Sequence, residues 1–291
     1  MKPLVPDYRR GKTLSVPKNN YLWDNSASPE VSERFASLEI MYDHITFQHI
    51  ESLGIAEGWK CLEVGGGGGS VSRWLSDKVG AAGRILITDI DTKFLTGMTW
   101  TIGNVDVLKN DITSDSGIPR GAFDLAHARL VLVHLSEREK ALANMVSALK
   151  PGGWVVIEDF DMMATEVLRD YHPRLGVPPT MSTELFAKVL RARNLLLEQH
   201  GADLHYARRL YSMLRSSGLV YVGMSTGGVS TWSGGSACAK LHIANSLQSR
   251  DEMIATGLLS EKEFDDSIKM MNDPEWVVFS HMMVSAWGRK P

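Results

Sequence analysis

The sequence predicts an α/β fold in which a mostly parallel, doubly wound sheet is covered by helices on both faces. Three observations lead to this prediction. Short apolar runs alternate with helical segments between residues 60 and 161, which is the pattern of parallel strands joined by crossover helices. Five glycines stand in a row between one apolar run and the helix that follows it. Hydrophobic residues make up 44% of the 291 residues and charged residues 22%, as is typical of a globular chain.

A long helix is expected before the first strand. Between Pro29 and Leu53, large side chains recur at steps of three and four, from Phe35 through Tyr42 to His49, which gives a helix one buried face. The alternation that follows predicts strands at 60–64, 84–88, 104–109, 123–127 and 154–158. The helices expected between these strands are 70–79, 92–98 and 137–149.

The regular alternation ends after Asp161. The remaining chain predicts helices at 182–200 and 203–217, a strand at 219–225, helices at 237–257 and 260–271, and an extended segment at 276–287, which makes seven strands in all. We expect segments 162–200 and 229–273, with an irregular arm at 1–28, to form a helical cap on one edge of the sheet. The chain is therefore divided into an arm with cap helices (1–54), a core with the glycine run (55–161) and the rest of the sheet with cap insertions (162–291), all within one domain.

Charge and cysteine content argue against several classes of protein. The net charge of −3 favours neither nucleic acid nor an anionic membrane surface as a partner. No apolar run approaches the ~20 residues of a membrane-spanning helix, and the N-terminus lacks the apolar centre of a signal peptide. Cys61 and Cys238 make no disulfide framework, so we expect a cytoplasmic protein. The nine histidines show no ligand spacing with carboxylates, and no metal is predicted.

The glycine run indicates where a ligand approaches the backbone. A glycine-rich turn between a strand and a helix brings a ligand close to free N–H groups at the helix start. A phosphate-binding loop needs Lys and Ser or Thr after its last glycine, but Ser70 and Val71 follow Gly69. A dinucleotide fingerprint, G-x-G-x-x-G, fails in every register.

The pattern Glu63-x-Gly65-x-Gly67-x-Gly69 resembles the first motif of class I S-adenosylmethionine-dependent methyltransferases. Three more segments resemble motifs of this family in the same order: "ILITDID" with "KNDIT", "FDLAHARLVLVHL", and "ALKPGGWVVIEDFD". The resemblance covers roughly residues 30–161 and continues more weakly to the end. It implies a Rossmann-like, seven-stranded fold and S-adenosyl-L-methionine as the cofactor.

The resemblance also implies roles for individual residues. The three motif glycines face the methionine half of the cofactor, whereas Gly66 and Gly68 are expected only to loosen the loop. Asp89 is expected to bind both ribose hydroxyls, and Asp91 to cap the next helix. The complete set of expected cofactor-binding residues is Glu63, Gly65, Gly67, Gly69, Asp89, Ile90, Asp111, Ile112 and Arg129. For Arg129 a buried salt bridge with Glu63 or Asp159 is an alternative role.

His134 is the candidate for catalysis, because an imidazole near neutral pH can accept a proton at the substrate-facing end of the sheet. Structural packing is the alternative role. Aromatic residues and methionines in the cap suit an apolar small molecule. The expected substrate-binding residues are Tyr21, Trp23, Asp159 and Trp232.

The resemblance therefore implies methyl transfer to an O, N or C atom of a small, largely apolar molecule, in secondary metabolism. Two alternatives stay open. The same fold can couple methylation to cyclisation or use the cofactor without methyl transfer, or the protein can be a cofactor-binding scaffold without turnover. The sequence leaves open whether the protein acts as a homodimer.

Overall fold

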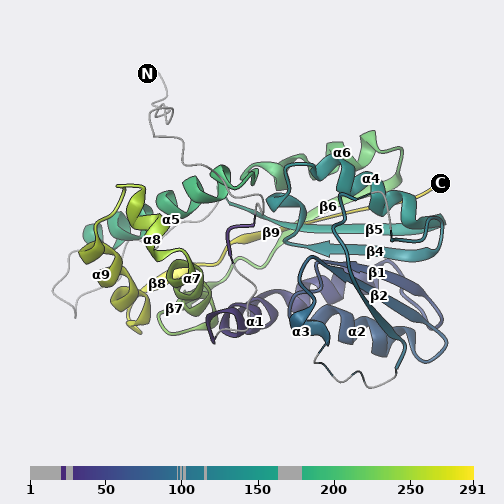
Figure 1. Ribbon diagram of the computed structural model, residues 1–291, viewed down its shortest axis with the longest axis horizontal. Helices are drawn as coiled ribbons and strands as arrows, with labels where there is room; N and C mark the ends of the chain where they lie inside the picture. The colour runs from purple at the N-terminus through teal and green to yellow at the C-terminus, as the bar shows by residue number, and fades with distance from the viewer. Residues whose placement is uncertain are drawn as a thin grey trace.

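The computed structural model describes residues 21–23, 29–96, 98, 100, 103–114, 117–162 and 179–291. The arm predicted at 1–28 therefore lies outside the described residues, apart from Tyr21, Leu22 and Trp23. Helices, a large sheet and a helical cap form one α/β structure (Figure 1). None of the helices in the described ranges is long and apolar enough to cross a bilayer.

The central sheet has the strand order β3-β2-β1-β4-β5-β9-β6. Five strands run parallel to one another, namely β1 (Lys60–Val64), β2 (Arg84–Asp89), β3 (Val105–Lys109), β4 (Phe123–Arg129) and β5 (Leu149–Asp161). Strand β9 (Met282–Arg289) runs antiparallel to β5 and to β6 (Val220–Gly227). The prediction of a mostly parallel, seven-stranded sheet is confirmed.

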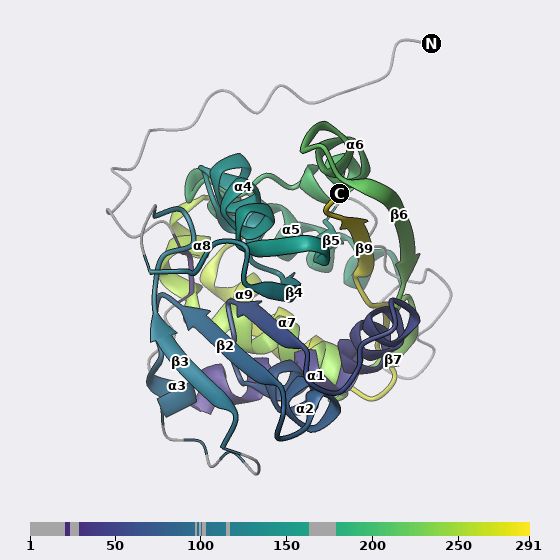
Figure 2. The same ribbon diagram turned by 90° about the vertical axis from the view of Figure 1, so that its right-hand side faces the viewer.

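Helices cover both faces of this sheet (Figure 1, Figure 2). One face packs against α4 (Arg138–Ala148) and α6 (Leu210–Ser216). The other face packs against α1 (Pro29–Ser52), α2 (Ser70–Val79) and α3 (Lys93–Thr96). Successive side chains of β1 point to opposite faces of the sheet. Leu62 packs in the apolar cluster with α4 and α6, and Cys61 packs in the cluster with α1, α2 and α3. The sheet is thus buried on both sides, as parallel sheets are.

The cap lies at one end of the sheet (Figure 1). It consists of α5 (Pro179–Gln199), α7 (Ala237–Gln248), α8 (Arg250–Ala255) and α9 (Glu261–Asn272), with a small sheet of β7 (Thr231–Ser233) and β8 (Val277–Phe279). Helix α1 packs against α7 as well as against the large sheet. A single apolar cluster therefore contains Tyr42 of α1, Phe186 of α5 and Trp276 before β8.

Four differences from the prediction divide an expected element or exceed three residues. The segment 276–287 is divided between β8 and β9, the segment 237–257 between α7 and α8, and the segment 203–217 between η2 (Tyr206–Arg209) and α6. Strand β5 begins five residues earlier than predicted, because the "KPGGW" turn already lies in the sheet. The pairing of β7 with β8 was not predicted. Both strands are short, and their paired residues, such as Trp232 and Val278, lie far apart in the sequence.

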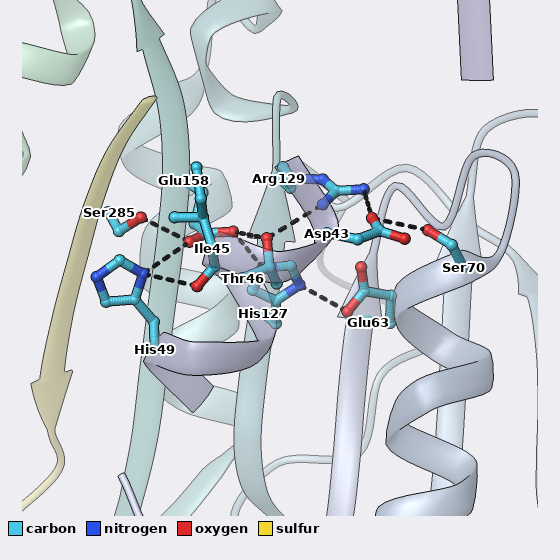
Figure 3. A network of polar contacts seen from close by, with 10 residues as sticks. All are labelled: Asp43, Ile45, Thr46, His49, Glu63, Ser70, His127, Arg129, Glu158 and Ser285. Atoms are coloured by element: carbon cyan, nitrogen blue, oxygen red, sulfur yellow. Dashed lines mark hydrogen bonds and ion pairs between the residues drawn. The ribbon is translucent and has the colours of Figure 1, made fainter. Parts of the chain in front are cut away.

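A buried network of charged groups ties the strand ends together (Figure 3). His127 of β4 lies between Glu63 of β1, with Nδ1 2.7 Å from Oε2, and Glu158 of β5, with Nε2 3.4 Å from Oε2. None of the three side chains is more than 4% exposed. Burial alone would lower the pKa of His127, but the two carboxylates outweigh it and raise this pKa from 6.5 to about 9. His127 is therefore an imidazolium at neutral pH.

The same network holds helix α1 against the sheet (Figure 3). The Thr46 hydroxyl donates to Glu158, and the Ser285 hydroxyl donates to Glu158 Oε1 at 2.6 Å. Burial would raise the pKa of Glu158, but these bonds and that of His127 lower it from 4.5 to about 2. Arg129 donates to Thr46 Oγ1 at 3.1 Å and to Asp43 Oδ1 at 2.8 Å. Helix α1 therefore joins the sheet through charged groups as well as through apolar contacts.

We predict that His127→Gln lowers the free energy of unfolding by about 3–5 kcal/mol, because it leaves two buried carboxylates without their cation. Urea unfolding at about pH 6 measures the change. His205→Gln is the matched control, since His205 is exposed and should cost less than about 0.5 kcal/mol. Equal stability of the two variants would contradict the role given to His127.

The pKa values also predict how this contribution depends on pH. The raised pKa of His127 stabilises the fold fully below about 6.5, and this stabilisation is lost as the pH rises through about 9. The lowered pKa of Glu158 stabilises the fold above about 4.5, and this stabilisation is lost as the pH falls through about 2. The wild type should therefore lose stability between about pH 6.5 and 9, and His127→Gln should lack this loss. A flat wild-type profile over that range would contradict the assignment.

Candidate active site

A cavity of about 390 Å³ lies where the carboxyl ends of β1, β2 and β4 meet α1 and the cap. Its wall has two chemically different regions. The first consists of the glycine loop after β1, the turn after β2 and the turn after β3. The second consists mainly of aromatic and apolar side chains, several of them on α1, α5 and α7, with polar groups such as Arg34 and Arg193 among them, and the wall as a whole also includes the carboxylates of Glu39 and Glu137. This position, at the carboxyl edge of an open parallel sheet, is where such folds bind ligands.

The glycine loop is restricted at every position. Gly65, Gly67 and Gly69 have φ angles of 72°, 50° and 81°, which side chains with a Cβ rarely adopt. The expectation that Gly66 and Gly68 only loosen the loop is wrong. A Cβ on Gly66 would lie 2.3 Å from Ile87 Cγ2, and one on Gly68 would lie 2.5 Å from Glu39 Oε1. Conformation requires the three motif glycines, and packing against Ile87 requires Gly66. At Gly68 the restriction is weaker, because Glu39 Oε1 is the end of a flexible side chain and Phe35 Cβ lies at 3.0 Å.

Asp89 at the end of β2 holds the loop in place. Its carboxylate accepts hydrogen bonds from the Gly67 N–H at 3.2 Å and the Asp91 N–H at 2.9 Å. Burial raises the pKa of Asp89, and these two bonds only partly offset the effect. Asp91 accepts from the Lys93 N–H at 3.1 Å, which confirms that it caps the next helix. Asp89 lines the cavity, so the same carboxylate is available to a bound ligand.

The turns after β2 and β3 form the far side of this region. Ile90 is 43% exposed and lines the cavity, so it offers an apolar surface to a flat ring. Asp111 also lines the cavity, and its Oδ1 accepts from the Thr113 N–H at 2.9 Å and the Thr113 hydroxyl at 2.7 Å. Ile112 is 5% exposed and packs in the sheet core while it contributes to the wall. The cofactor roles of these residues stay predictions.

Glu63 and Arg129 line the cavity from the ends of β1 and β4. The alternative role of Arg129, a salt bridge, is present, but the partners named for it, Glu63 or Asp159, are wrong. Its guanidinium pairs with Asp43 of α1 instead (Figure 3), while Glu63 pairs with His127. Asp43 also accepts from the Ser70 hydroxyl at 3.1 Å, at the start of α2. Two side chains of α1, Asp43 and Thr46, therefore hold Arg129 where it borders the cavity.

His134 lies in a group of aromatic rings. Its ring centroid is 5.1 Å from that of Tyr21 and 5.7 Å from that of Trp23, in edge-to-face geometry. Burial, with a smaller effect of the Arg34 charge, lowers the pKa of His134 to about 4. The imidazole is therefore neutral at physiological pH and a weak base. All three residues line the cavity, so Tyr21 and Trp23 are placed where a substrate could contact them.

Two of the predicted substrate residues are not in the cavity wall that the described residues form. Asp159 is fully buried in β5, and burial raises its pKa well above the ordinary carboxyl range, which the Val133 amide only partly offsets. Trp232 lies in β7 and packs against the apolar cluster of the cap. The position of Asp159 follows from the pleat of β5, because successive side chains of a strand point to opposite faces. Phe160, the next residue, lines the cavity instead.

Other wall residues were not predicted. Helix α1 contributes Arg34, Leu38 and Glu39, of which Glu39 lies against the glycine loop. Arg193 of α5 was also not predicted to line the cavity. It follows Phe186 by seven residues and Val189 by four, and this spacing places it on the apolar face of that helix. A charged residue on the apolar face of a predicted helix was the feature of the sequence that could have identified Arg193 as a candidate site residue.

No group of three or more His, Cys, Asp or Glu side chains suited to a metal ion occurs among the described residues.

Comparison with known proteins finds a family model that matches the segment containing the glycine loop and the turns after β2 and β3. Residues 62–157 match the family model described as a methyltransferase domain. The ubiquinone/menaquinone biosynthesis C-methyltransferase UbiE of Pseudoalteromonas translucida is 26% identical over 163 residues, which are 50% of this chain and 64% of that protein. Methyltransferase str3 of Strobilurus tenacellus is 31% identical over 99 residues, 34% of this chain and 32% of that protein. The matches thus span less than two thirds of these relatives.

Solved structures agree on the fold. The phosphoethanolamine N-methyltransferase 2 of Haemonchus contortus, in complex with phosphomonomethylethanolamine and S-adenosylhomocysteine, superimposes with a TM-score of 0.53 at 14% identity, over 92% of this chain and 59% of that one. The YcgJ protein of Bacillus subtilis gives a TM-score of 0.53 at 15% identity, over 86% of this chain and 99% of that one. At these identities the likeness concerns the fold.

We predict that Asp89→Ala weakens the binding of S-adenosylhomocysteine by about 1–3 kcal/mol, because a charged acceptor of ligand hydrogen bonds is removed and the Gly67 N–H loses its partner. Calorimetric titration measures the affinity. Asp91→Ala is the matched control, since Asp91 caps α3 and should leave the affinity within about threefold. If only the Asp91 variant binds weakly, the ribose partner has been misassigned.

Proposed function

We propose that this chain, whose core is a class I S-adenosylmethionine-dependent methyltransferase domain, transfers the methyl group of S-adenosyl-L-methionine to a small, largely apolar molecule. The observation that carries this proposal is one cavity with two regions. The glycine loop, Asp89 and the turn at Asp111 follow β1, β2 and β3 in the order of that domain, and the aromatic region with Tyr21 and Trp23 lies opposite them. Cofactor and acceptor would meet within this space.

The cofactor-binding side would use the backbone more than side chains. The positive φ angles of the motif glycines let the methionine half approach without a Cβ between. Asp89 would accept hydrogen bonds from the ribose hydroxyls, and Ile90, Asp111 and Ile112 would border the adenine. Glu39 and Arg129 border the loop, where they would face the charged amino-acid end of the cofactor. The bound cofactor supplies an electrophilic methyl group on a sulfonium.

The chemical step is an in-line displacement. The acceptor would supply the electron pair of the new bond to the methyl carbon, as a lone pair of oxygen or nitrogen or as the π pair of an electron-rich carbon. The carbon–sulfur bond would break with its electron pair left on sulfur, which would give S-adenosylhomocysteine. Positioning supplies most of the acceleration, because the leaving group is already good. The neutral His134 would accept a hydrogen bond from the acceptor, but a pKa of about 4 restricts it to weak general-base catalysis. The acceptor proton would then leave mainly to water.

The acceptor side of the cavity supports a small apolar molecule. Phe160, Met162, Leu197, Leu204 and Leu241 line it, and apolar walls of this kind bind small ligands by burial. The relatives named C-methyltransferases support a carbon acceptor, while oxygen and nitrogen stay open. Secondary metabolism and the cytoplasm as its place of action stay predictions from the sequence.

The proposal predicts that purified protein with methyl-labelled cofactor labels one or more compounds in pools of phenols, quinols, amines and carboxylic acids, with one S-adenosylhomocysteine formed per methyl transferred. Gly67→Val is the inactive control, because a β-branched residue at a φ of 50° is strained and its Cβ would lie 3.2 Å from Phe35. Cofactor binding without labelling of any pool would favour a scaffold. Labelling of added protein or RNA would overturn the small-molecule acceptor.

A further inference from the structure

We infer that the methyl acceptor carries a carboxylate, and that Arg193 is the residue that binds it. This inference rests on the proposed function and names the substrate class of the same cavity. Arg193 lies on α5, at the part of the wall that the cap forms, and not at the glycine loop.

The guanidinium of Arg193 is buried, and the hydrogen-bond partners that the structure gives it are two histidines. Its residue is 1% exposed. Nη1 donates to Nδ1 of His242 at 2.8 Å, and Nη2 donates to Nε2 of His281 at 3.4 Å. Nε has no hydrogen-bond partner in the described part of the chain. Among the residues that the structure describes, no carboxylate forms an ion pair with Arg193.

The two histidines give hydrogen-bond acceptors but no countercharge. Each accepts a hydrogen bond from Arg193 on the stated ring nitrogen, which requires a neutral imidazole. Burial and the charge of Arg193 lower the pKa of His281 to about 3 and that of His242 well below its ordinary value. Burial lowers the pKa of Arg193 itself only to about 10, so the group stays positively charged at neutral pH.

A buried cation in this state is costly to the free protein. Removing an ion from water costs several kcal/mol unless a countercharge and hydrogen bonds compensate it. A ligand with a negative group would supply both, since a guanidinium presents parallel N–H donors that match the two oxygens of a carboxylate. The unused Nε donor of Arg193 is the group that such an oxygen would satisfy.

The surrounding wall restricts the rest of the ligand. The side chains on this side of the cavity are mainly apolar, and they include Phe160, Leu197 and Leu241. The polar exceptions are His281 and Asn245, whose Oδ1 has no hydrogen-bond partner. One guanidinium between neutral rings matches a single negative charge better than a dianionic phosphate. The acceptor is therefore an aromatic or aliphatic carboxylic acid with a mainly apolar body.

The test is a binding experiment on the full chain saturated with S-adenosylhomocysteine. Calorimetry compares matched pairs: 4-hydroxycinnamate with its methyl ester, 4-hydroxybenzoate with its methyl ester, and decanoate with decanol. We expect the wild type to bind the carboxylate of at least one pair about tenfold or more tightly than its neutral counterpart. Arg193→Gln should remove this preference and leave the affinity for the neutral compound unchanged. Arg191→Gln, on the exposed face of the same helix, should keep the preference.

Three results would overturn the inference. The first is a wild type with no preference for carboxylates in any pair, and the second is a preference that survives in Arg193→Gln. The third is a loss of S-adenosylhomocysteine binding in Arg193→Gln, which would mean that Arg193 holds the carboxylate of the cofactor. Failure of the proposed function looks different, because the wild type would then bind no cofactor or label no acceptor.

A stability measurement separates ligand binding from a structural role. Arg193→Met removes the charge and keeps much of the side-chain volume, so the melting temperature without ligand should be equal to or higher than that of the wild type. A decrease of more than about 5 °C would mean that Arg193 stabilises the free fold through a partner, and would overturn the inference.

Discussion

The imidazolium of His127, held between Glu63 and Glu158, is the interaction on which the arrangement of the cavity depends. It joins the carboxyl ends of β1, β4 and β5, the strands at the centre of the sheet. Buried charges of this kind add little net stability when they are complete and cost much when one member is lost. Their larger effect here is on geometry, because each partner fixes the direction of the next.

Helix α1 is the element that this geometry holds. Thr46 reaches the same carboxylate as His127, and Asp43 connects Arg129 of β4 with Ser70 of α2. The result is that Phe35 and Glu39, on earlier turns of α1, lie against the glycine loop. The helix is thus a fixed wall of the cavity, and the sequence alone, which placed it only in the cap, gave no sign of this attachment.

The sequence was sufficient where a local rule determines the structure. The glycine run after an apolar pentapeptide predicted the loop, and the positive φ angles of Gly65, Gly67 and Gly69 agree with the motif register. The strands of the core were predicted within a few residues, because buried parallel strands are short apolar runs. The position of Asp89 in the cavity wall agrees with the same motif, whereas its hydrogen bond with the Gly67 N–H was not predicted.

The sequence was insufficient where contacts join distant segments. Arg129 pairs with a residue 86 positions earlier, and no local pattern distinguishes Asp43 from the other acids. Gly66 and Gly68 are restricted by side chains of β2 and α1, which only the assembled fold brings near. Arg193 interrupts an apolar helix face, but its neutral partners come from α7 and from the turn between β8 and β9. Trp232 is an aromatic residue of the cap that the fold uses for packing.

The central claim is that the charge network holds α1 as a wall of the cavity before any ligand binds. Hydrogen–deuterium exchange of residues 41–50, with and without S-adenosylhomocysteine, tests it most directly, because exchange reports local opening of the helix. The account predicts that these amides are as protected as those of β4 and β5 without ligand, and that the ligand changes their protection little. Rapid exchange of this segment in the free protein, followed by strong protection on binding, would contradict it and would make α1 a lid that the ligand closes.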